Sequence, residues 1–254
     1  MKAYKAYCLD LDGTVYKGTE PIPSAVAFIH ALQKSGIEPF YITNNARMTQ
    51  QQVQQKLLKM GICAPEAHIL TSAIATAKYI GNHHPNATVQ MIGGEGLREA
   101  LLAENITFTS DQPDVLVQGI DLEINYSKIE NACYVIQNGA EFVATNGDIK
   151  FPNEKGFAPG NGAIAELIHN VTGVKPTYIG KPQPHMLAIL QQLNGFEKED
   201  MLMIGDNYDT DILAGIHFGI DTLHVNTGVT STESVLKKDI QPTYSMNSLL
   251  DWQL

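Results

Sequence analysis

The sequence has few basic residues and no long apolar run, and each shortage excludes a class of protein. Lysine and arginine number 17 against 27 acidic residues, the formal charge is −10, and no segment is rich in lysine or arginine. A nucleic-acid partner is therefore not expected, because binding a phosphate backbone needs such clusters. No apolar run reaches membrane length, and residues 1–5 lead into a short strand and not a signal sequence, so we expect no membrane partner.

Cysteine is also scarce, which bears on the compartment. The three cysteines, Cys8, Cys63 and Cys133, are an odd number at unrelated spacings. We interpret them as reduced thiols of a cytoplasmic protein, since disulfide frameworks use paired cysteines in oxidising compartments. The 254 residues, 44% of them hydrophobic, suffice for roughly one and a half to two folded domains.

The stretch from Tyr7 to Tyr16 leads an apolar run directly into two carboxylates and a glycine. Residues 6–9 predict a buried strand, and Gly13 offers the positive φ that a sharp turn at its end requires. Asp10 would then lie at the carboxyl end of the strand, where ligands bind in open α/β sheets. A carboxylate there can act as a nucleophile or hold a metal ion. The alternative is an Asx turn in which Asp12 bonds its own backbone and Asp10 is solvated.

Strands and helices alternate along the chain, which predicts a doubly wound parallel-sheet (Rossmann-like) α/β core with a smaller inserted α/β domain. The breaks at His83-His84-Pro85 and at residues 171–176 place the core at 1–82 and 176–254 and the insert at 83–175. We expect core strands at 6–9, 38–43, 178–180, 201–205 and 222–225, followed by a short C-terminal helix. Insert strands are expected at 88–92, 115–118 and 141–145, with a Gly/Pro-rich loop at 151–162.

Four core strands end in polar residues, and a parallel sheet brings all four ends to one edge. Each could be a turn residue, a solvated lysine or a helix N-cap, but four agreeing strand ends favour a site. Three carboxylates about 4 Å apart would repel one another by about 4 kcal/mol per pair, so a cation is needed among them. Mg²⁺ suits carboxylate oxygens, whereas zinc is not expected because no histidine or cysteine is near. The residues are Asp10 with Asp12, Thr43 with Asn44, Lys181, and Asp206 with Asp211.

The order and spacing of these motifs resemble the haloacid dehalogenase-like phosphatases. The matching residues are Asp10-x-Asp12-Gly-Thr, Thr43, Lys181 and Gly205-Asp206-x-x-x-Thr210-Asp211. The insert length, with the segments 43–45, 144–148 and 159–162, is similar to the C2-capped branch (subfamily IIA). That branch contains NagD-like sugar phosphatases and p-nitrophenyl phosphatases.

The resemblance implies a magnesium-dependent phosphatase of small phosphate monoesters such as sugar phosphates, nucleoside monophosphates and p-nitrophenyl phosphate. Asp10 would attack phosphorus to form an aspartyl phosphate, and Asp12 would act as general acid and base. Asp10, the backbone carbonyl of Asp12 and Asp206 would hold Mg²⁺. Thr43, Asn44 and Lys181 would bind the phosphoryl group.

Further roles carried over from the family concern support and specificity. Asp211 would orient Lys181 or a metal-bound water, and the loop from Asn207 would touch substrate. Asn146, Asp148 and Asn161 in the insert are candidates for contacting the leaving group, although a long surface loop also explains them.

Two other function classes are compatible with a phosphate site at strand ends. A receiver-like phosphorylation switch also gathers acidic residues, a threonine and a lysine there, but it needs only one small domain. A non-catalytic sugar-phosphate sensor would not need the acid/base group Asp12. The expected partner is thus a small phosphorylated metabolite, and a homodimer is an expected state because caps of this type often form dimer contacts.

Overall fold

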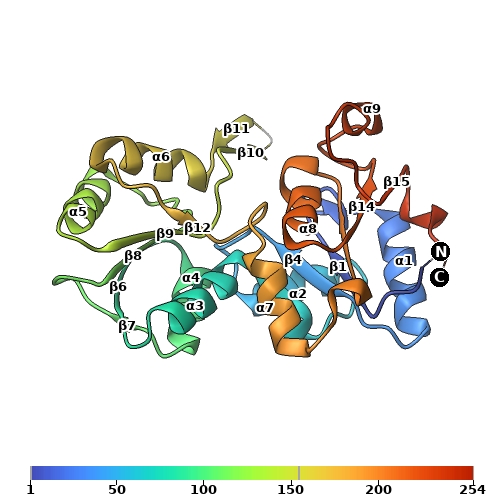
Figure 1. Ribbon diagram of the computed structural model, residues 1–254, viewed down its shortest axis with the longest axis horizontal. Coiled ribbons are helices and arrows are strands. Elements are labelled where there is room, and N and C mark those ends of the chain that lie inside the picture. The colour runs from blue at the N-terminus through green and yellow to red at the C-terminus, as the bar shows by residue number, and fades with distance from the viewer. Residues whose placement is uncertain (1, 154, 254) are drawn as a thin grey trace. The chain divides into compact units, whose positions relative to one another are not determined.

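The computed structural model describes residues 2–153 and 155–253, and the chain divides into two compact units (Figure 1). The core unit comprises Met1–Thr43, Gln50–Leu70 and Lys181–Leu254. The insert unit comprises Asn44–Thr49 and Thr71–Gly180. Each unit has its own sheet and its own buried side chains, and each is described by itself below.

The core unit is built on a six-stranded sheet with the order β15-β14-β13-β1-β4-β5. Its strands are β1 (Ala6–Leu9), β4 (Phe40–Thr43), β5 (Ile69–Thr71), β13 (Met201–Gly205), β14 (Asp221–Val225) and β15 (Tyr244–Met246). The pairings of β1 with β4 and β13, and of β14 with β13 and β15, are parallel. Every residue of β1, β4 and β13 is buried, as expected for parallel strands covered on both faces.

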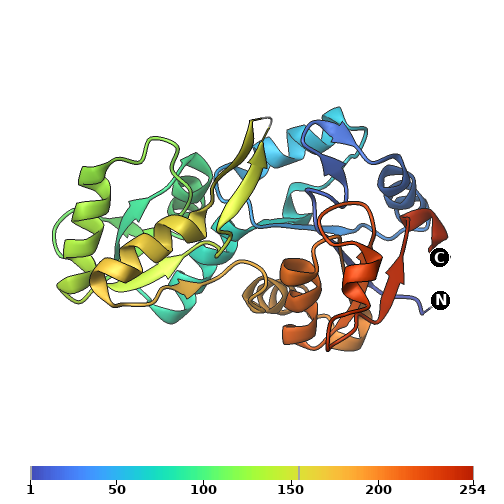
Figure 2. The same ribbon diagram turned by 90° about the horizontal axis from the view of Figure 1, so that it is seen from above.

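Helices cover both faces of this sheet. In Figure 2, α1 and α2 lie on one side of it and α7 and α8 on the other. The helices are α1 (Pro23–Lys34), α2 (Gln50–Lys59), α7 (His185–Asn194), α8 (Leu213–Phe218) and α9 (Thr232–Val235). Shorter elements are β2 (Tyr16–Lys17), β3 (Glu20–Pro21), η1 (Glu66–His68), η2 (Lys198–Asp200), η3 (Tyr208–Ile212) and η4 (Leu249–Asp251).

The strand order reverses between β1 and β13, because β4 continues the sheet on one side and β14 on the other. Such a switch point leaves room for a ligand beyond the carboxyl ends of the two strands, since their connections run to opposite faces. Asp10 follows β1 and Asp206 follows β13. The fold thus brings these two carboxylates to the same place from opposite ends of the chain.

The insert unit contains a five-stranded parallel sheet with the order β12-β9-β8-β6-β7. Figure 1 shows α5 and α6 on one face of it and α3 and α4 on the other. Leu116, Phe142, Ala132 and Ala165 belong to the apolar cluster between the sheet and the α5–α6 face. The strands are β6 (Thr88–Ile92), β7 (Thr107–Phe108), β8 (Val115–Gln118), β9 (Glu141–Ala144) and β12 (Thr177–Tyr178). The helices are α3 (Ser72–His83), α4 (Glu95–Ala103), α5 (Tyr126–Gln137) and α6 (Asn161–Thr172).

The predicted fold class, a doubly wound parallel core with a smaller α/β insert, is confirmed. The units divide the chain at Thr71 and Gly180, whereas the sequence placed the boundaries at residues 83 and 175. Helix α3 packs on α4 inside the insert unit, where Lys78 Nζ donates to Glu104 Oε1 at 2.7 Å. The His-His-Pro break therefore marks only the end of α3, and the packing that assigns α3 to the insert is not visible in the sequence.

Three segments differ from the sequence prediction. The strand expected in the core at 178–180 is β12, which pairs with β9 in the sheet of the insert unit. The expected loop at 151–162 contains an antiparallel hairpin of β10 (Lys150–Asn153) and β11 (Gly156–Pro159), followed by the start of α6. Several glycine and proline residues of this segment thus lie in two short paired strands. An alternation of apolar and polar residues over so few positions is too short to predict a strand. The region after β14 adds an edge strand, β15, besides the short helix α9.

Among the described residues, no helix is long and apolar enough to span a membrane.

Candidate active site

Asp10 lies directly after the buried strand β1 and is itself 7% exposed. Its backbone N–H donates to Ile204 O of β13 at 2.9 Å, so the ladder between the two strands continues through Asp10. The chain then turns at Gly13, where φ is +97° and a Cβ atom would overlap the Asp206 carboxylate. Only glycine fits this turn, because an L side chain would be strained there and would displace Asp206.

Asp206 follows β13 and is completely buried. Its carboxylate accepts hydrogen bonds from the Thr14 hydroxyl at 3.0 Å and from the Val229 N–H at 2.6 Å. Gly228 allows the backbone before Val229 to lie close to Asp206, because a Cβ atom at position 228 would collide with the carboxylate. The pKa of Asp206 is raised to about 6, first by burial and then by the Asp211 charge, while the two hydrogen bonds act in the opposite direction.

Lys181 is the cation of the site, and 2% of it is exposed. Its Nζ donates to Asp10 Oδ1 at 2.5 Å, to Asp211 Oδ1 at 2.7 Å and to the carbonyl of Ile42 at 3.2 Å. Burial alone would lower the pKa of Lys181, but the two carboxylates raise it above its usual value. The charged form of the lysine is therefore favoured. Its ammonium contacts the two carboxylates and one backbone carbonyl of the site.

Asp211 belongs to the η3 segment, which leads into α8. Its Oδ2 accepts from the Asn207 N–H at 3.0 Å, and its Oδ1 also accepts from the Thr210 hydroxyl at 3.1 Å. Gly205 makes space for this carboxylate, because a Cβ atom there would overlap it. The side chain of Asn207 caps η3 by accepting from the Asp209 N–H at 3.1 Å. The Asn207 side chain is thus engaged within its own segment. Its predicted contact with substrate stays a prediction.

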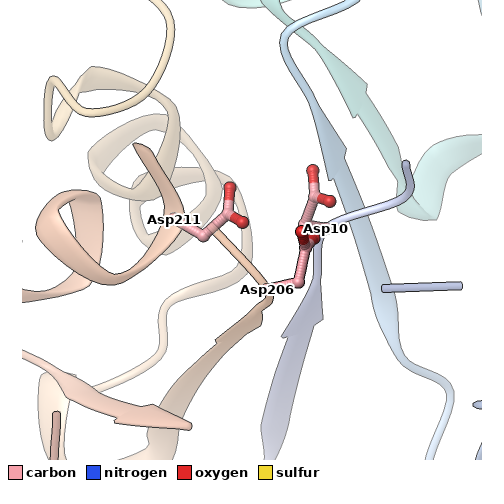
Figure 3. A group of neighbouring side chains, drawn as sticks. All are labelled: Asp10, Asp206 and Asp211. Carbon is pink, nitrogen blue, oxygen red and sulfur yellow. The ribbon is translucent and has the colours of Figure 1, made fainter. Parts of the chain in front are cut away.

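The three buried carboxylates form one cluster (Figure 3). One ligand oxygen from each of Asp10, Asp206 and Asp211 can be chosen so that all lie within 4.8 Å of one another. When all three carboxyl groups are ionised, the charge of Lys181 offsets only one of them. Burial raises the pKa of Asp10 well above its usual value, the Asp211 charge adds to this, and Lys181 opposes it. A hard divalent cation would relieve the excess negative charge, and carboxylate oxygens are its preferred ligands, so these residues fit Mg²⁺.

Asp12 lies outside this cluster, although it is only two residues from Asp10. Its side chain is exposed, and the sequence assigned its backbone carbonyl, not its carboxylate, to the metal. Surrounding protein atoms nevertheless remove enough water to raise the pKa of Asp12, while Lys56 and the Gly18 N–H lower it. The structure therefore separates a buried, metal-type group of carboxylates from one accessible carboxyl that can exchange protons. Asp211, predicted as a supporting residue, stands in the cluster with the two predicted metal ligands.

Thr43 and Asn44 are neighbours in sequence but belong to different units. Thr43 ends β4 and is 6% exposed at the same edge of the core sheet as Asp10. In the insert unit, the carbonyl of Asn44 accepts from the Ser72 hydroxyl at 2.7 Å and from Asn146 Nδ2 at 2.8 Å. The peptide between Asn44 and Asn45 is thus held by two side chains of the insert unit.

The insert candidates are mostly used inside their own unit. Asn146 and Asn161 are 5% and 2% exposed, and Asn161 Nδ2 donates to the carbonyl of Asn146 at 2.8 Å. Gln118, which the sequence analysis missed, donates to Asn161 Oδ1 at 2.7 Å. Asp148 is half-buried and accepts from Asn44 Nδ2 at 3.1 Å. Of the three candidates, Asp148 is the least buried in this network, and a contact with the leaving group stays a prediction for all three.

Comparisons with known proteins show which family the chain belongs to. A family described as haloacid dehalogenase-like hydrolase matches residues 7–107, and a second HAD-hydrolase-like family matches residues 178–252. An acid sugar phosphatase of Staphylococcus epidermidis is 47% identical over 98% of this chain and 96% of its own length.

Solved structures of related proteins match the whole chain. A thermostable NPPase double mutant from Geobacillus stearothermophilus has a TM-score of 0.94 at 43% identity, covering 100% of this chain and 99% of the other. A putative p-nitrophenyl phosphatase from Bacillus subtilis has a TM-score of 0.91 at 41% identity, covering 99% and 96%. The chain therefore belongs to the haloacid dehalogenase-like hydrolases and is a phosphoric monoester hydrolase.

Proposed function

We propose that the protein is a magnesium-dependent phosphatase of small phosphate monoesters, with sugar phosphates as its first candidate substrates, and that it works through an aspartyl phosphate on Asp10. The observation that carries the proposal is the buried cluster of Asp10, Asp206 and Asp211 around Lys181 at the switch point of the sheet. The cluster offers one carboxylate for attack, a cation for the phosphoryl oxygens and a place for a divalent ion.

In the first half-reaction, an Asp10 carboxylate oxygen attacks phosphorus while the bond from phosphorus to the ester oxygen breaks. Asp12 gives its proton to that oxygen, so the leaving group departs as a neutral alcohol. Burial raises the pKa of Asp12, which favours the protonated carboxyl relative to a fully solvated aspartate. In the second half-reaction, Asp12 takes a proton from a water that attacks phosphorus, which releases inorganic phosphate and restores the Asp10 carboxylate.

The remaining side chains hold the phosphoryl group during both steps. The Lys181 ammonium and the Thr43 hydroxyl donate to its equatorial oxygens, and the Asn44 N–H adds a third donor. Mg²⁺, held by Asp10, Asp206 and the Asp12 carbonyl, would neutralise part of the phosphate charge when bound. Asp211 keeps Lys181 in place through its 2.7 Å ion pair.

The insert unit would select the substrate by covering the leaving group and excluding water. The relatives named acid sugar phosphatase and p-nitrophenyl phosphatase support small monoesters as substrates. Asp148 at its half-buried position is our first candidate for a leaving-group contact. A homodimer and a cytoplasmic location belong to the same proposal, the latter because Cys8, Cys63 and Cys133 are all free thiols.

The test is inorganic phosphate release from a panel of monoesters, including p-nitrophenyl phosphate and several sugar phosphates, with Mg²⁺ and with EDTA. The wild type should release phosphate only with Mg²⁺, and Asp10→Asn should lose at least about a thousandfold in rate, because the amide cannot attack phosphorus. Circular dichroism spectra of both proteins should agree. Normal turnover by Asp10→Asn would contradict the nucleophile, and stable labelling by acetyl phosphate without release would favour a phosphorylation switch.

A further inference from the structure

The loop between β14 and α9 contacts the candidate active site in ways that the proposed mechanism leaves unused. It comprises residues 226–230, of which three are exposed, so apolar burial does not hold most of it in place. Hydrogen bonds do so instead. The Thr227 hydroxyl donates to the carbonyl of Gly13 at 2.7 Å, and the Val229 N–H donates to Asp206 Oδ2 at 2.6 Å. The loop is thus bonded both to the turn after β1 and to the carboxylate after β13.

The Asp206 carboxylate lies between two glycine backbones. A Cβ atom at Gly13 or at Gly228 would overlap its oxygens, so only glycine permits the close approach of these two segments. Oδ1 accepts from the Thr14 hydroxyl at 3.0 Å, and Oδ2 accepts from the Val229 N–H. A carboxylate oxygen with one such donor keeps a lone pair for a cation. These contacts therefore orient the carboxylate without closing it to a metal ion.

The turn after β1 carries the second proposed metal ligand from the protein, the backbone carbonyl of Asp12. The Gly13 N–H donates to the carbonyl of Tyr16 at 2.7 Å, and the Asp12 carbonyl points the opposite way because the peptide between them is trans. The next carbonyl along the chain, that of Gly13, is held by Thr227. The turn is thus fixed on one side by its own backbone and on the other by the loop.

His224 holds the far end of the loop. It is completely buried in β14, and its Nε2 lies 2.9 Å from the carbonyl oxygen of Thr230. A carbonyl can only accept a hydrogen bond, so Nε2 carries the hydrogen and donates it. The hydroxyl oxygen of Thr230 also accepts from the Tyr208 N–H at 3.0 Å. The loop is therefore fastened to the sheet at one end and to the turn after β1 at the other.

We propose that residues 227–230 form a positioning loop that sets the spacing between the Asp206 carboxylate and the Asp12 carbonyl for a divalent cation, and that Thr227 fixes this spacing. The inference rests on the proposed function, which supplies the assignment of these two groups as Mg²⁺ ligands. Thr227 contacts no reacting atom and acts through the carbonyl of Gly13. Removing a group that holds a metal ligand in this way typically changes metal affinity by about 10- to 100-fold.

The readout is the affinity for Mg²⁺, measured without substrate by isothermal titration calorimetry on protein treated with EDTA and then dialysed. Thr227→Val keeps the shape of the side chain but loses the hydroxyl, so the dissociation constant should rise by at least about tenfold. Thr227→Ser keeps the hydroxyl and should restore most of the affinity. The matched control is Thr243→Val, which removes a hydroxyl that bonds Asp221 at the opposite end of the sheet and should leave Mg²⁺ binding unchanged.

His224 offers a second pair of variants. The amide nitrogen of His224→Gln can take the place of Nε2 and should preserve Mg²⁺ affinity, whereas His224→Asn is too short to reach Thr230 and should weaken it. Ser245→Ala is the control, because it removes only the hydroxyl that lies 3.0 Å from His224 Nδ1. Thermal melting of each variant checks that it is folded.

Phosphate release gives an independent measure of the same effect. The Mg²⁺ concentration that gives half of the maximal rate should rise in Thr227→Val by the same factor as the dissociation constant. Unchanged Mg²⁺ affinity in Thr227→Val would overturn the proposal, and so would an equal loss in Thr243→Val, because a general loss of structure would then explain both. The proposed function fails separately, if wild-type protein binds Mg²⁺ but releases no phosphate from any ester.

Discussion

At the scale of single residues, Lys181 decides the charge of the site. Its Nζ contacts the carboxylate of Asp10, directly after β1, and that of Asp211 in the η3 segment, and nearly all of the side chain is buried. A buried cation shared by two carboxylates compensates their desolvation, and removing it leaves charges that neither water nor protein solvates. Stability and catalysis are therefore coupled at this residue.

We expect Lys181→Met to abolish phosphate release and to lower the free energy of unfolding by about 3–5 kcal/mol in metal-free buffer. Methionine keeps the stem but not the charge, so the Asp10 and Asp211 carboxylates lose their partner. Urea unfolding at pH 7 gives the stability, and the exposed Lys237→Met serves as the control. Unchanged stability in Lys181→Met would mean that the carboxylates are not ionised around the lysine.

The sequence predicted the residues of this cluster because they stand at ends of parallel strands. Asp10, Lys181, Asp206 and Asp211 are brought together as expected, and Asp10 and Asp206 follow the core strands β1 and β13. Lys181 was predicted for the wrong reason, because the strand before it, β12, pairs with β9 in the insert sheet and not with a core strand. Thr14, which bonds Asp206, could have been found in the Asp-Gly-Thr motif. No sequence motif marks Gly228 and Val229 as neighbours of Asp206. Their contact with Asp206 arises from the tertiary fold, which brings this distant loop to the carboxylate.

At the scale of elements, the start of β14 joins three parts of the core unit. Asp221 accepts hydrogen bonds from Lys2 Nζ at 2.8 Å, from the Tyr4 hydroxyl at 2.8 Å and from the Thr243 hydroxyl at 3.2 Å. Asp221 thereby connects β14 to Lys2 and Tyr4, which precede β1, and to Thr243, which precedes β15. Burial opposes ionisation, but the donors outweigh it, and the pKa of Asp221 lies below its usual value.

Because the folded-state pKa of Asp221 is below the unfolded one, its contribution to stability is present above about pH 4 and is lost as pH falls through the folded pKa. Asp221→Asn should cost at most about 1 kcal/mol at pH 7, since the pair with Lys2 is partly exposed, and the cost should shrink toward pH 3. Urea unfolding of both proteins at several pH values measures this. The exposed Asp239→Asn is the control, and a difference that is constant with pH would contradict the assignment.

The elements that the sequence predicted best are those with clear apolar runs. The strands expected at 88–92, 115–118 and 201–205 coincide with β6, β8 and β13. The hairpin of β10 and β11 and the edge strand β15 were missed, because short strands at an edge bury little and carry no strong pattern. The polar residues Gln118, Asn146 and Asn161 form hydrogen bonds that depend on tertiary neighbours, so the sequence could name two of them as candidates but not their internal role.

At the scale of the whole molecule, the acidic cluster lies in the core unit, and the insert unit has a separate sheet and apolar core. A ligand that binds only the folded core unit stabilises that unit by mass action. Local opening free energies differ between cooperative parts of a protein, so hydrogen exchange can report where the stabilisation acts. A magnesium site built from Asp10, Asp206 and the Asp12 carbonyl should therefore protect the core unit in particular.

We expect saturating Mg²⁺ to slow amide hydrogen exchange in peptides covering β1, β13 and the η3 segment, while peptides covering β8 and α5 change little. At about 100 times the dissociation constant, the gain for the core unit should approach about 2.7 kcal/mol. Hydrogen–deuterium exchange with mass spectrometry, with Mg²⁺ and with EDTA, measures this directly. Asp206→Asn keeps an oxygen for the Val229 N–H but loses a charge, so the protection should largely disappear. Protection that persists in this variant, or that spreads equally over both units, would place the ion elsewhere.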